Sequence, residues 1–83
     1  MKARYLVESA PYTAKILAVL CRAFDGGWEE IAHHFDGDAK GEQAARMRLA
    51  YAVLVAARED SNDPERLKRE ALEVMALAYR QVG

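Results

Sequence analysis

The sequence predicts an all-α fold: a compact bundle of three long helices plus one short helix, in a single domain over residues 1–83. Three observations support this prediction. Apolar residues recur at helical spacing along most of the chain. Glycines, prolines and polar turns divide the chain into segments of helix length. Alanine, the strongest helix former, supplies much of the 52% apolar content.

The first half of the chain should contain a short lead and two helices. Residues 1–8 permit either an extended arm or a helical turn, and their conformation stays open. A long helix is expected over residues 11–24, because Pro11 suits a first helical turn. Gly26 and Gly27 are expected to end it, since glycine reaches left-handed C-terminal geometry without a Cβ clash. A short helix should follow over residues 28–35, with one buried face: Trp28, Ile31, Ala32 and Phe35.

The second half should contain two long helices. The third helix is expected over residues 39–59 with Asp38 as its N-cap, and Gly41 should weaken its first turn by up to ~1 kcal/mol. After a polar turn at 60–63, the fourth helix is expected over residues 64–81, capped by Asp63 with Pro64 in first position. Its buried stripe is expected to be Leu67, Ala71, Val74 and Ala78.

The composition limits the classes of function that the chain can have. The chain has 12 basic and 13 acidic residues, whereas non-specific nucleic-acid binders usually carry a basic excess. Cys21 is the single cysteine, so an intrachain disulfide is excluded and a reducing compartment is favoured. No secretion signal is evident, and the longest apolar run is far shorter than the ~20 residues that span a bilayer. We therefore expect a cytoplasmic protein that does not act in a membrane.

The most informative segment is residues 49–57, nine consecutive apolar residues inside the expected third helix. A helix without a polar face must be covered on nearly all sides, by its own chain or by a second copy. One stripe (Ala45, Leu49, Ala52 and Ala56) can face the core. The other predicts a partner-binding surface: Met47, Arg48, Tyr51, Leu54, Val55 and Arg58. The leading interpretation is a small, non-enzymatic protein-interaction or regulatory module that forms a homodimer through this stripe.

The alternative is a small DNA-binding regulator. The segment 28–35, with its Glu-Ile-Ala core, resembles the first helix of a helix-turn-helix. The resemblance implies that Ile31, Ala32 and Phe35 pack against a recognition helix. That helix would offer four residues to DNA: Lys40, Gln43, Arg46 and Arg48. The sequence departs from the pattern, because Gly37 lies one position late and Glu42 stands where an apolar residue is expected.

Catalytic and metal chemistry have little support in the sequence. Glu30 and His33 share one side of a helix, as in the Glu-x-x-His pairs of di-metal bundles. Such a site needs a second pair, and both histidines of the chain lie in this one segment, so one copy cannot supply it. A third interpretation is therefore a metal-binding helical protein with Glu30 and His33 as weak candidates. Cys21 near His33 or His34 lacks a recognisable orienting group or oxyanion site. We expect no catalytic residues, no cofactor and no physiological metal.

Overall fold

The computed structural model describes the backbone of residues 2–82 and the side chains of residues 2–77. In chain order the elements are α1 (Lys2–Glu8), α2 (Ala14–Ile31), the 3-10 helix η1 (Ala32–Phe35), α3 (Ala39–Ala56) and α4 (Pro64–Val82). The described residues form helices joined by turns, without a strand, so the all-α prediction is confirmed.

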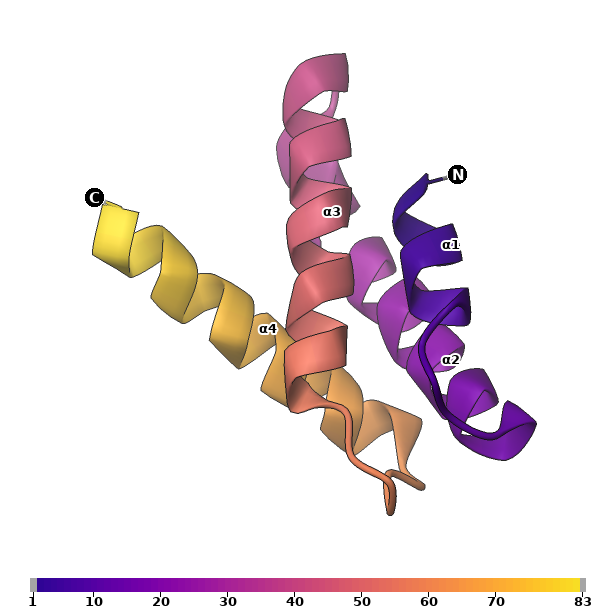
Figure 1. Cartoon of the computed structure of the whole chain (residues 1–83). Coiled ribbons are helices and arrows are strands. Elements are labelled where there is room, and N and C mark those ends of the chain that lie inside the picture. The colour runs from indigo at the N-terminus through magenta and orange to yellow at the C-terminus, as the bar shows by residue number, and fades with distance from the viewer. Residues whose placement is uncertain (1, 83) are drawn as a thin grey trace.

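Helix α3 lies at the centre of the molecule (Figure 1). It contacts α1, α2, η1 and α4, while α4 crosses it and diverges toward its own C-terminal end. The radius of gyration is 12.2 Å, close to the value of about 12 Å for a folded chain of this length. The largest fully buried side chains are Phe24, Leu20, Leu49, Val7 and Val53. Ala78, expected in the α4 stripe, lies outside the described side chains.

The short helix is α1, and the segment expected to be the short helix is not a separate α-helix. Residues 2–8, left open by the sequence, form seven residues of helix and bury Ala3 and Val7. Pro11 lies in the connection after α1 rather than inside a helix. Thr13 begins α2 instead, because its hydroxyl accepts a hydrogen bond from the Ile16 backbone N–H at 3.4 Å.

Gly26 and Gly27 do not end a helix, which corrects the expected boundary. Helix α2 continues through both to Ile31 and then tightens into η1. The glycines lie where neighbouring helices come closest: a Cβ at Gly26 would stand 3.3 Å from Cδ of Lys68, and one at Gly27 would stand 3.3 Å from Cδ1 of Leu49. Their function here is close packing, whereas the chain reverses at Gly37, which has a positive φ of 80°.

Asp38 caps α3 as predicted, and the absence of a side chain at Gly41 makes this cap possible. The Asp38 carboxylate accepts a hydrogen bond from the Gly41 backbone N–H at 2.9 Å. A Cβ on Gly41 would collide with that same carboxylate. The glycine that weakens the first turn is therefore the residue that leaves room for the cap.

This arrangement predicts a coupled pair of substitutions. Asp38→Ala should lower the free energy of unfolding by about 1 kcal/mol, the usual cost of losing an N-cap. Gly41→Ala should be unfavourable in the parent chain, yet stabilising by up to ~1 kcal/mol once Asp38 is alanine, because only helix propensity then remains. Urea unfolding of the two single variants and the double variant measures this. Equal effects of Gly41→Ala in both backgrounds would contradict the coupling.

The junction between α3 and α4 ends α3 earlier than expected. The helix stops at Ala56 rather than residue 59, because the Arg58 backbone N–H donates to the Ser61 hydroxyl at 2.9 Å. Asp63 caps α4 through the Glu65 backbone N–H at 3.1 Å, with Pro64 in first position, as predicted. None of the described helices is both long and apolar enough to cross a membrane.

Candidate protein-interaction surface

Helix α3 presents one buried face and one open face, and the two predicted stripes fall on opposite sides. Ala45, Leu49 and Ala52 are buried, and Ala56 is half-buried. The opposite stripe contains the exposed residues Arg48, Tyr51 and Val55. The 3.6-residue period was therefore sufficient to separate the two faces.

The apolar run 49–57 is covered on three sides by its own chain. Leu49, Ala50, Ala52 and Val53 are buried, and Leu54 packs in part against the core. Tyr51 keeps 55% of its surface exposed and Val55 keeps 71%. The chain itself therefore supplies this cover except along the strip that contains Tyr51 and Val55.

We define the open face of α3 as Met47, Arg48, Tyr51, Leu54 and Val55. Met47 and Leu54 are half-buried at its edge toward the core. Arg58, predicted as part of the same stripe, lies beyond the helix end and lines a cleft at the α3–α4 junction. The face is therefore shorter than predicted.

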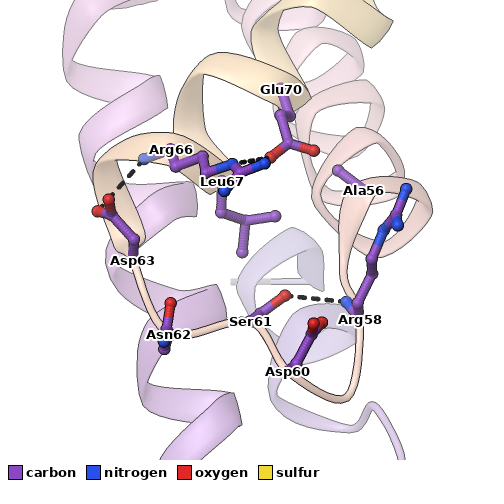
Figure 2. Close-up of a pocket in the computed structure, with 9 residues that line it drawn as sticks. All are labelled: Ala56, Arg58, Asp60, Ser61, Asn62, Asp63, Arg66, Leu67 and Glu70. Atoms are coloured by element: carbon purple, nitrogen blue, oxygen red, sulfur yellow. Dashed lines mark hydrogen bonds and ion pairs between the residues drawn. The ribbon is translucent and has the colours of Figure 1, made fainter.

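That cleft has a volume of about 410 Å³ and is polar (Figure 2). Arg66 forms an ion pair with Glu70 at 3.3 Å, and Asp63 and Ser61 are used for capping hydrogen bonds. Leu67 points into its middle. Carboxylates and guanidinium groups mix along its walls, so the cleft favours no ligand of one charge. Its lining residues are Ala56, Arg58, Asp60, Ser61, Asn62, Asp63, Arg66, Leu67 and Glu70.

The N-terminal half of α3 contains a contact that the sequence did not predict. The Arg46 guanidinium stands 4.7 Å from the centroid of the Trp28 ring and forms an ion pair with Glu42 at 2.8 Å. Trp28 also stacks on Phe35, with ring centroids 6.0 Å apart. The i,i+4 spacing of Glu42 and Arg46 was a detectable signal for the ion pair. Nothing local indicated the contact with Trp28.

This contact bears on the DNA-binding alternative. Lys40, Gln43 and Arg48 are exposed, and the Arg46 guanidinium contacts both Glu42 and the Trp28 ring. The separate first helix that the resemblance implies is the end of α2 followed by η1. Arg46 would have to leave both of these partners to contact DNA.

The Glu30–His33 pair is not arranged as a metal site. The Glu30 carboxylate accepts a hydrogen bond from Lys68 Nζ at 2.9 Å, and Lys68 also reaches Glu65 at 2.9 Å. These hydrogen bonds raise the pKa of Lys68 above its ordinary value. The His33 and His34 rings lie against each other, with their centroids 4.1 Å apart. Within the part of the chain that the structure describes, no group of three or more potential ligands could hold a metal ion.

Cys21 is a half-buried thiol on α2. Burial raises its pKa above the ordinary value, although the nearby Arg4 guanidinium acts in the opposite direction. Arg4 itself forms an ion pair with Glu8 inside α1 at 3.0 Å and a second with Asp25 at 3.3 Å, and the second connects α1 with α2. A raised pKa keeps the thiol protonated near neutral pH, which is the opposite of what a nucleophilic cysteine needs.

The open face of α3 is the candidate site because it places two exposed large apolar side chains, Tyr51 and Val55, one helical turn apart. Comparison of the chain with protein-family models, with curated proteins and with solved structures gives no match.

Proposed function

We propose that this chain is a small, non-enzymatic helical interaction module that binds a protein through the open face of α3. The observation that carries the proposal is the exposure of Tyr51 and Val55 on a helix whose opposite face is buried. Tyrosine is among the residues that most often dominate protein–protein contacts, since it buries a large area at low entropic cost.

The rest of α3 supports the same function. Its buried face is packed by α1, α2 and α4, so the helix is held in place before any partner arrives. A preorganised surface loses less conformational entropy on binding. Met47 and Leu54 extend the apolar area around Tyr51, and Arg48 borders it. An apolar centre with a polar edge is the usual composition of a protein-binding surface.

The test is site-specific photo-cross-linking in cells that express the full chain. A photoreactive amino acid in place of Tyr51 or Val55 should give discrete protein adducts, identified by mass spectrometry. The matched position is Ala18, exposed on α2, whose outer side faces away from α3. Adducts should be absent there and should disappear from position 55 when Tyr51→Glu is added.

Tyr51→Glu should leave the helix content unchanged, because the side chain is already half in water. Far-UV circular dichroism checks this, with Ala18→Glu as the variant that adds the same charge elsewhere. Identical adducts at positions 18, 51 and 55 would refute the proposal.

A further inference from the structure

We infer that the open face of α3 is occupied by a second copy of this chain, packed antiparallel with Tyr51 at the two-fold axis. This inference rests on the function proposed above and names its partner. A two-fold interface brings the same surface patch of both copies together, so the patch must be complementary to itself. The residues around Tyr51 meet that condition.

The apolar residues are symmetric about Tyr51. Met47 lies one helical turn before it and Val55 one turn after, all on the open face. In an antiparallel pair centred on Tyr51, Met47 of each copy faces Val55 of the other, while the two Tyr51 rings meet at the centre. The pairing covers Tyr51 and Val55, the two large apolar side chains of α3 that the monomer leaves exposed.

The charges select the antiparallel direction. The exposed basic residues Lys40 and Arg48 lie on the same side of α3 as Tyr51, whereas Glu42, the one acidic residue of the helix, lies on the opposite side and is paired with Arg46. A parallel pair would set Lys40 against Lys40 and Arg48 against Arg48. The antiparallel pair sets Arg48 opposite Leu54 and separates the two Arg48 residues by about 9 Å along the axis.

The acidic loop between α3 and α4 completes the match. Lys40 lies eleven positions before Tyr51, and eleven positions after it the chain is in the loop that contains Asp60 and Asp63. Figure 1 shows this loop continuing beyond the end of α3. In this segment the exposed carboxylates of Glu59, Asp60 and Asp63 outnumber the one exposed guanidinium of Arg58. An antiparallel second copy therefore brings each Lys40 toward a net negative charge, an attraction that acts over the Debye length of about 8 Å at physiological salt.

The expected dimer is weak. A standard stable interface buries about 800 Å² on each partner, and the face of one helix offers less. Sedimentation equilibrium over a wide concentration range should show a reversible shift from the mass of one chain toward the mass of two. Tyr51→Glu should abolish the shift and Ala18→Glu should preserve it.

Cysteine cross-linking tests the direction. In a Cys21→Ser background, differently tagged chains with Met47→Cys and Val55→Cys are mixed and treated with a short thiol-to-thiol cross-linker. The 47–55 product should dominate over the 47–47 and 55–55 products. A preference for the two homotypic products would overturn the antiparallel arrangement.

The outcomes separate this inference from the proposed function. A chain that keeps the mass of one copy at all concentrations, yet forms Tyr51-dependent adducts with another protein in cells, would overturn the second copy and retain the interaction surface. A single-copy mass without such adducts would overturn both.

Discussion

Phe24→Ala should remove about 3–5 kcal/mol of stability, the largest loss expected for a substitution in this chain. Phe24 is 1% exposed and is the bulkiest of the fully buried side chains. Its truncation removes apolar contacts and leaves a cavity that the surrounding helices can fill only in part. An 83-residue domain typically has about 4–12 kcal/mol of total stability, so this loss is a large share of the total.

Urea denaturation followed by circular dichroism measures this loss. Phe24→Leu is the companion variant, because it keeps most of the volume and should cost less than about 1.5 kcal/mol while remaining folded. Phe35→Ala is the positional control, since Phe35 is half-buried and should cost less than Phe24. A Phe35→Ala loss equal to that of Phe24→Ala would show that the core is not centred where the structure puts it.

Gly27→Val should destabilise the protein by about 1–3 kcal/mol, because the site has no room for a side chain. A Cβ there would stand 3.3 Å and 3.4 Å from the two Cδ atoms of Leu49, which is itself fully buried and cannot move aside. Since glycine is a poor helix former, the same substitution on an open helix face would stabilise it. Thermal unfolding shows whether Gly27→Val lowers the stability of the protein or raises it.

The matched variant is Gly26→Val, one position earlier in the same helix. Its Cβ would meet only Cδ of Lys68, part of a flexible chain that can shift, so the cost should be much smaller. Adding Leu49→Ala to Gly27→Val should recover part of the loss, because the two changes exchange volume at one contact. Strict additivity of these two substitutions would contradict the close approach of α2 and α3.

Local signals in the sequence predicted local structure well. Asp38, Asp63 and Pro64 mark helix starts because capping involves residues three positions apart or fewer. The two faces of α3 also followed from spacing alone. Each of these features depends on neighbours that a single helical turn brings together.

The errors came from residues whose environment is set by distant segments. In the sequence, Gly26 and Gly27 have the pattern of a helix end. Their role in close packing becomes visible only when the structure brings Leu49 and Lys68 against them. The contact between Arg46 and Trp28 likewise depends on how the turn at Gly37 returns α3 against α2. The degree to which the other helices cover Tyr51 and Val55 is a property of the whole fold. The function of their face remains a prediction.

The packing around Trp28 provides an intrinsic optical reporter. It is the single tryptophan of the chain, and its indole contacts both the Phe35 ring and the Arg46 guanidinium. Its emission thus originates from packing that involves α2, η1 and α3. Loosening of the packing around Trp28 can therefore be followed by tryptophan fluorescence in unlabelled protein, separately from binding at the open face of α3.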